Sequence, residues 1–113
     1  MDISWAHDNT ILEIMQGDQY GIPIRIAMAG RILTDGDLAA VEIVIGKLRK
    51  TTPVITYSAE IERWILPLTQ AETLSMAAAD SPAQIRVLFP DGSVKGYPLG
   101  MIRIIPTLSR EVL

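Results

Sequence analysis

Cysteine is absent from this sequence of 113 residues, and histidine occurs once, as His7. Without thiols the chain can form no disulfide, no thiolate nucleophile and no cysteine-type zinc site. One histidine is also too few for a zinc site built from imidazoles, so we interpret His7 as a solvated residue. Phosphate-binding loops are missing too, because the eight glycines stand singly at turns and never in a G-x-G or G-K-[ST] pattern.

Aromatic residues and long apolar stretches are scarce as well. Aromatic side chains make up 5% of the chain and hydrophobic residues of all kinds 49%, so the core must be built mainly from aliphatic side chains. No apolar run approaches the roughly 18 residues that a membrane-spanning helix needs. Residues 1–7 lack the basic and apolar regions of a signal peptide. We therefore expect one globular domain, made in the cytoplasm and without a membrane partner.

The chain has no excess of positive charge. Lysine and arginine number 10 against 13 aspartates and glutamates, which gives a net charge of −3. A nucleic-acid-binding domain usually carries a basic patch or stripe, and the densest basic cluster here is only Lys47, Arg49 and Lys50. We interpret this cluster as a solvated turn and expect no nucleic-acid partner.

Alternation of apolar and polar residues predicts short β-strands along most of the chain. The expected strands are residues 10–16, 21–29, 40–46, 53–57, 61–68, 83–89, 93–97 and 101–105. About seven or eight strands at intervals of about 8–12 residues, with one helix, are typical of an antiparallel β-sandwich or a small barrel. Alternating rather than continuous apolar residues argue against a parallel α/β sheet.

We expect a single β-sandwich domain over residues 1–113. Residues 1–9 are predicted to form an N-terminal arm or a short first strand, and residues 106–113 a polar tail. Glu42 is expected to point outward from its strand. The residues expected on the core side are Ile22, Ile24, Ile26, Met28, Val41, Ile43, Ile45, Ile85, Val87 and Phe89.

The clearest local signal is a strand-to-helix corner. Residues 64–68 alternate with Trp64 on the apolar face, and Thr69 followed three residues later by Glu72 forms a capping-box pattern. In such a box the threonine oxygen accepts from the backbone N–H of the glutamate, and the carboxylate accepts from the backbone N–H of the threonine. The pattern predicts a short helix from residue 70 to about residue 76.

Catalytic and metal-binding patterns are weak. The Asp35-Gly36-Asp37 segment resembles the start of a calcium loop, but the further carboxylates are missing, and a helix cap or turn is the better interpretation. Glu60 and Glu62 share a strand face beside turns, where solvation accounts for them. No G-x-S-x-G elbow places a nucleophile. We therefore predict no catalytic residues, no cofactor, no metal and no enzyme activity.

Two features favour binding instead. The C-terminal residues Leu108, Val112 and Leu113 belong to a tail of apolar and charged residues that has no evident place inside a sandwich, so they are candidates for a subunit interface. Sheet edges offer a second route to assembly, because a partner can add a strand there. The alternative is a small carbohydrate-binding module with Trp64 or Tyr57 as a stacking platform, although aromatic residues at inward positions are more often core or interface.

Several motifs recur in a known order. They are Gln16-Gly17-Asp18 before an alternating strand, the segment 35–41 before the next strand, Trp64 to Thr73, Pro82 to Val87, Pro90 to Val94 and the terminal Leu108 to Leu113. In this order they resemble a family of small structural proteins encoded by phages and prophages of Firmicutes. More distantly, they are similar to the N-terminal immunoglobulin-like domain of phage baseplate upper proteins.

The resemblance implies an all-β, antiparallel immunoglobulin-like sandwich that acts as a virion structural protein. Its expected place is a phage tail, baseplate or head–tail connection, and its expected partners are further copies of itself and other phage structural proteins. The protein would then be located in the phage particle after synthesis in the bacterial cytoplasm. No catalytic residue carries over from the family.

Overall fold

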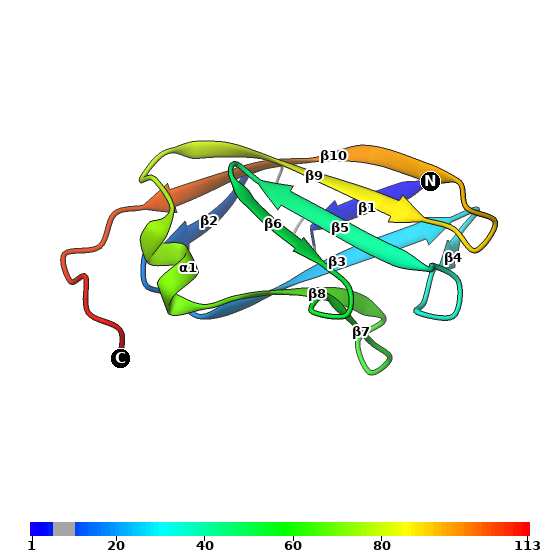
Figure 1. Ribbon diagram of the computed structural model, residues 1–113, viewed down its shortest axis with the longest axis horizontal. Coiled ribbons are helices and arrows are strands. Elements are labelled where there is room, and N and C mark those ends of the chain that lie inside the picture. The colour runs from blue at the N-terminus through cyan, green and yellow to red at the C-terminus, as the bar shows by residue number, and fades with distance from the viewer. Residues whose placement is uncertain (6–10) are drawn as a thin grey trace.

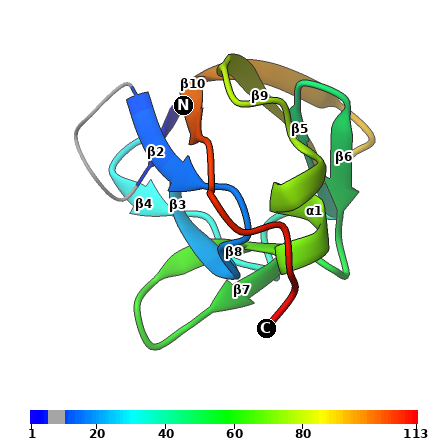
Figure 2. The same ribbon diagram turned by 90° about the vertical axis from the view of Figure 1, so that its left-hand side faces the viewer.

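A computed structural model describes residues 1–5 and 11–113 and shows two β-sheets packed face to face with one short helix at one end (Figures 1 and 2). The molecule is elongated, with extents of 46 × 25 × 24 Å. Residues 6–10, which include His7 and the rest of the predicted arm, lie outside the described residues. Residues 2–5 form a short first strand, which is one of the two structures predicted for the N-terminal residues.

The first sheet contains strands from the beginning and the middle of the chain. Its order is β1 (Asp2–Trp5), β3 (Tyr20–Met28), β8 (Arg63–Leu68) and β7 (Thr56–Ser58), and β4 (Arg31–Ile32) pairs with the end of β3. All of these pairs are antiparallel. The sheet edges are therefore the short strands β1 and β7.

The second sheet contains the longer C-terminal strands. Its order is β2 (Ile11–Met15), β10 (Val94–Ile105), β9 (Asp80–Leu88), β5 (Ala40–Ile45) and β6 (Leu48–Thr51). β2 runs parallel to β10, whereas the other pairs are antiparallel. The predicted antiparallel sandwich is thus confirmed, with one parallel pair that the sequence did not predict. Alternation reveals which face a side chain takes but not the direction of the neighbouring strand.

The strand order is immunoglobulin-like, as predicted. β1, β3, β8 and β7 occupy the places of strands A, B, E and D, and β10, β9 and β5 those of G, F and C. The helix α1 (Gln70–Ser75) lies in the connection between β8 and β9. The described strands number ten rather than seven or eight, because β1, β4 and β6 carry no strong alternation signal.

The core lies between the two sheets and is almost entirely aliphatic. Of the residues expected to face it, all those on β3, β5 and β9 are buried except Met28, which is exposed where β3 ends. Phe89, just after β9, is half-buried against the core. Residues 53–55 form a turn rather than the start of a strand, but Ile55 is buried in the core.

The C-terminal part of the chain forms one long strand where two were expected. β10 pairs with β9 through Val94 to Arg103, and its register shifts between Pro98 and Gly100. Gly100 has φ 125, a conformation that favours glycine. The prediction of two strands, residues 93–97 and 101–105, is therefore wrong, because the residues between them form an irregularity inside one strand.

Candidate functional site

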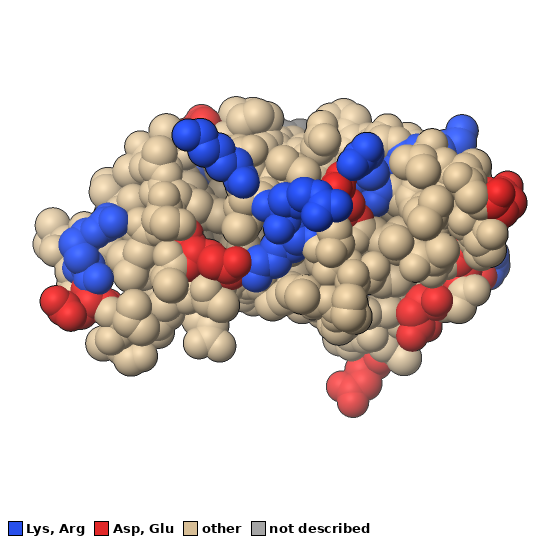
Figure 3. Space-filling model, viewed as in Figure 1, with Lys and Arg blue, Asp and Glu red and all other residues tan. Residues whose placement is uncertain are grey.

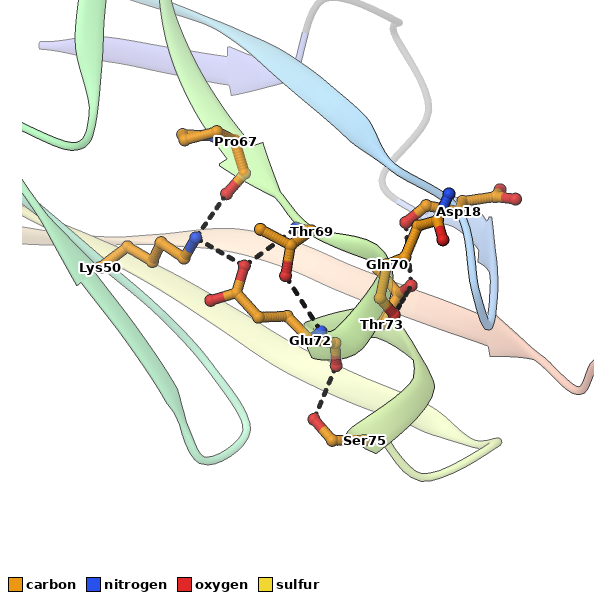
Figure 4. A network of polar contacts seen from close by, with 8 residues as sticks. All are labelled: Asp18, Lys50, Pro67, Thr69, Gln70, Glu72, Thr73 and Ser75. Carbon is orange, nitrogen blue, oxygen red and sulfur yellow. Dashed lines mark hydrogen bonds and ion pairs between the residues drawn. The ribbon is translucent and has the colours of Figure 1, made fainter. Parts of the chain in front are cut away.

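The predicted capping box is present at the strand-to-helix corner (Figure 4). Thr69 Oγ1 accepts from Glu72 N at 3.1 Å, and Thr69 N donates to Glu72 Oε1 at 2.9 Å. α1 runs from Gln70 to Ser75, one residue short of the expected end. The box fixes where β8 stops and holds Trp64 in register against the core.

Lys50 connects this corner to the second sheet. Its Nζ donates to Glu72 Oε1 at 2.6 Å and to the Pro67 carbonyl at 2.9 Å (Figure 4). The Lys50 side chain is only 12% exposed, so the prediction that it lies in a solvated turn is wrong. Partial burial of Glu72 opposes ionisation, but the hydrogen bonds from Lys50 and Thr69 outweigh it and hold the pKa of Glu72 below its usual value.

Thr73 connects the same helix to the turn after β2. Its buried hydroxyl donates to the Asp18 carbonyl at 2.8 Å and accepts from Gly17 N at 2.9 Å. α1 is therefore tied to both edges of the second sheet, through β6 and through the turn after β2. The corner residues Trp64, Thr69 and Glu72 therefore make their contacts inside the protein and support its structure. Glu72 is only partly exposed.

Trp64 cannot serve as a sugar-stacking platform. Its ring is 2% exposed, and its Nε1 donates to the Leu33 carbonyl at 2.9 Å. Tyr57 is half-buried and packs edge-on against it, with ring centroids 5.5 Å apart. The carbohydrate-binding alternative with Trp64 as the platform is therefore wrong, because this ring is used inside the protein. The same role for Tyr57 stays a prediction.

The C-terminal segment, residues 106–113, lies outside the sandwich beside α1 (Figure 2). Arg110 holds it there, because its guanidinium donates to Gln16 Oε1 at 3.0 Å and to the Leu74 carbonyl at 2.7 Å. The second bond satisfies a carbonyl at the end of the helix. Leu113 N donates to Gln70 Oε1 at 2.7 Å. This anchor could not be predicted from the sequence, because Arg110 meets its partners only in the folded protein.

Three aliphatic side chains of this segment face solvent. Leu108 and Leu113 are fully exposed and Val112 is 60% exposed. Exposed aliphatic residues are common singly, but a group of them on an anchored segment is a recognised mark of an interaction surface. The interface role of these residues therefore stays a prediction.

A second surface lies on the outer face of β5, β6 and β9, where basic side chains gather around a carboxylate (Figure 3). Glu42 Oε1 accepts from Arg86 Nε at 2.6 Å, and Glu42 Oε2 accepts from Arg49 Nε. The hydrogen bond from Arg86 outweighs the effect of burial and, with Arg49, lowers the pKa of Glu42 to about 2. Glu42 points outward as predicted but is only 9% exposed, because the two arginines cover it.

This outer face contains two hollows that meet at Arg86. One has a volume of about 550 Å³, and its walls include Val44, Gln84, Gly96 and Pro98. The other, about 260 Å³, lies over Glu42, Arg49 and Arg86, which we call the ion cluster. We call the two hollows together the outer groove. Sequence reasoning missed it, although one signal was available, since Glu42 is a charged residue within an otherwise apolar strand.

Among residues 1–5 and 11–113, no group of three or more His, Cys, Asp or Glu residues could hold a metal ion. Asp37 closes a turn instead, with its carboxylate accepting from Thr34 N at 2.9 Å and from Arg31 at 3.1 Å. These two contacts hold the pKa of Asp37 below its usual value. Within the described part of the chain, no helix is long and apolar enough to span a membrane.

Comparisons with known proteins show a fold and no family. No protein-family model and no curated protein sequence matches the chain. Among solved structures, the chain is similar to the fibronectin(III)-like modules of Clostridium thermocellum CbhA, with a TM-score of 0.60 and 11% identity over 96% of this chain and 99% of that one. At such low identity the likeness establishes the β-sandwich fold alone.

A second match is to Bacteroides ovatus SGBP-B, from a mixed-linkage glucan utilization locus and solved in complex with a mixed-linkage heptasaccharide. It has a TM-score of 0.42 and 14% identity, and it covers 89% of this chain but 21% of that protein.

Proposed function

We propose that this protein is a non-catalytic structural module that works by assembling into oligomers, and that it belongs to the virion of a phage or prophage. The observation that carries the assembly proposal is the C-terminal segment. Arg110 anchors this segment to α1, while Leu108, Val112 and Leu113 face solvent. An anchored apolar surface loses little conformational entropy when it binds, which favours association.

The assignment to a virion rests on the sequence resemblance described above. That resemblance includes the C-terminal residues Leu108 to Leu113, which the structure places on the outside of the fold. The proposed location is a tail, baseplate or head–tail connection. Mass spectrometry of purified particles from an induced host tests this location, and we expect the chain to co-purify with the particles.

Assembly is tested by measuring the mass in solution of the wild-type chain and of a variant with Leu108→Ser, Val112→Ser and Leu113→Ser. We expect the wild type to form oligomers and the variant to be shifted toward monomer, because each buried aliphatic side chain contributes about 1.5–3 kcal/mol. The matched control is Val54→Ser with Ile61→Ser, since these residues are about half exposed and lie elsewhere. A wild type that is monomeric and binds no neighbouring phage product contradicts the proposal.

A second candidate function is carbohydrate binding, and one observation favours it. The larger hollow of the outer groove is lined by Gln84 and Arg86, which offer hydrogen-bonding groups to a sugar. Isothermal titration against a panel of glycans, with Gln84→Ala as the comparison variant, tests this function. Binding that is lost in Gln84→Ala supports it, and silence across the panel rules against it.

A further inference from the structure

Three exposed aliphatic residues do not make a stable interface by themselves. Their burial favours association, but association costs a comparable free energy in lost translational and rotational freedom. The C-terminal segment therefore needs a shaped receiving surface that adds further contacts. This inference rests on the proposed assembly function and concerns where that surface lies.

The outer groove has the charge that such a segment requires. Arg49 and Arg86 share one carboxylate, that of Glu42, so the ion cluster keeps one surplus positive charge. Both guanidiniums donate to Glu42 through Nε, and more than half of each side chain is exposed, so further N–H groups are free to bind an anion. An anionic group beside apolar residues is the ligand that this surface suits best.

The C-terminal segment has the complementary pattern. Glu111 is exposed and directly precedes the two apolar residues Val112 and Leu113. The larger hollow, of about 550 Å³, presents Val44, Pro82 and Pro98 beside Arg86. An acidic residue followed by two aliphatic residues thus matches an arginine that lies beside an apolar hollow.

The segment of the same molecule is not positioned to fill this groove. Arg110 and Leu113 are hydrogen-bonded to α1, and from the end of β10 the segment runs past α1, away from β9 (Figures 1 and 2). Reaching its own groove would require breaking both contacts. A second copy of the chain can present its segment without losing either one.

We propose that the C-terminal segment of one copy docks into the outer groove of a second copy. Val112 and Leu113 enter the larger hollow, and Glu111 lies against Arg86 and Arg49. The contact joins two different surfaces, so after one contact each copy still has one of its two surfaces free for a further neighbour. Such heterologous contacts produce rings when the rotation closes and open filaments when it does not.

The test uses two complementary variants of the full chain. The segment variant carries Val112→Ser and Leu113→Ser. The groove variant carries Val44→Glu and Gln84→Glu, two outward positions that place carboxylates where Glu111 would approach. Circular dichroism and thermal melting of each variant establish that it is folded.

We expect each variant alone to be monomeric, and their equimolar mixture to form a dimer of one copy of each and nothing larger. In that mixture one intact groove meets one intact segment, and both remaining surfaces are blocked. A third variant, Glu111→Arg, should weaken assembly about tenfold in the wild-type background.

The outcomes separate this inference from the proposed function. A wild-type oligomer that neither double variant disrupts overturns the docking, while assembly through another surface stands. A mixture that stays monomeric also overturns the docking, as it would if the groove holds a glycan or a segment of a different protein. A wild type that is monomeric at every concentration and binds no neighbouring phage product removes the proposed function itself.

Discussion

Lys50 and Glu72 are 22 residues apart in sequence, and their side chains meet at 2.6 Å. The pair joins β6, at the edge of the second sheet, to the first turn of α1, which continues from the first sheet. Because Glu72 also closes the capping box, one carboxylate ends a strand, starts a helix and fastens the two sheets together at this end of the sandwich.

Replacing Lys50 with Met should destabilise the fold by about 1–3 kcal/mol, because Glu72 keeps its partial burial and loses its charged partner. The free energy of unfolding in urea measures the effect. Lys47→Met is the matched control, since Lys47 lies in the adjacent turn and is exposed. That control should change stability by no more than about 0.5 kcal/mol. Equal effects of the two substitutions would contradict the role assigned to Lys50.

Replacing Thr69 with Ala should cost about 1 kcal/mol, the usual effect of losing an N-cap side chain. Thr69→Ser keeps the accepting hydroxyl and should restore most of the loss. Urea unfolding of the two variants separates a capping role from a packing role. If Ser is as destabilising as Ala, the methyl group of Thr69 matters and its hydroxyl does not.

The strands could be predicted because their inward residues are aliphatic and recur with a period of two, as Ile22, Ile24 and Ile26 do. β6 escaped prediction because Arg49 and Lys50 make it look like a turn, although Lys50 is largely buried against Glu72. The ion cluster of Glu42 and Arg86 also escaped, because the two residues are 44 positions apart and become neighbours only through the register of β5 against β9.

The ion cluster should make the stability of the fold depend on pH. The pKa of Glu42 in the folded protein is lowered from 4.5 to about 2, so its contribution is complete above pH 4.5 and is lost as the pH falls toward 2. Glu42→Gln cannot lose a proton and removes this contribution at every pH. The stability difference between the wild type and Glu42→Gln, measured by urea unfolding, should therefore shrink as the pH falls from 5 to 2. A difference that stays constant or grows would be inconsistent with the assigned pKa.

Replacing Arg110 with Ala should release the C-terminal segment while changing global stability by only about 1 kcal/mol, since its two bonds are only partly buried. Amide hydrogen exchange of residues 107–113 should become faster, and assembly should weaken because a loose segment loses more entropy on docking. Arg63→Ala is the control, because Arg63 bonds only to carbonyls of its own turn among the described contacts. Unchanged exchange in Arg110→Ala would show that something else holds the segment.

Both tryptophans are buried, Trp5 on β1 and Trp64 on β8. Fluorescence emission should therefore be shifted to the blue and protected from acrylamide, and added glycans should leave it unchanged. A red-shifted spectrum that glycans alter would place an aromatic ring at a ligand site and favour the carbohydrate-binding function.

The mass of the wild-type chain in solution tests the central claim most directly. Sedimentation velocity from about 10 μM to about 1 mM covers the affinities expected of a small interface. Assembly through the C-terminal segment predicts species heavier than the 12.4 kDa monomer, and a return to 12.4 kDa when Leu108, Val112 and Leu113 are replaced by Ser. A wild-type protein that sediments as a 12.4 kDa monomer across that whole range would contradict it.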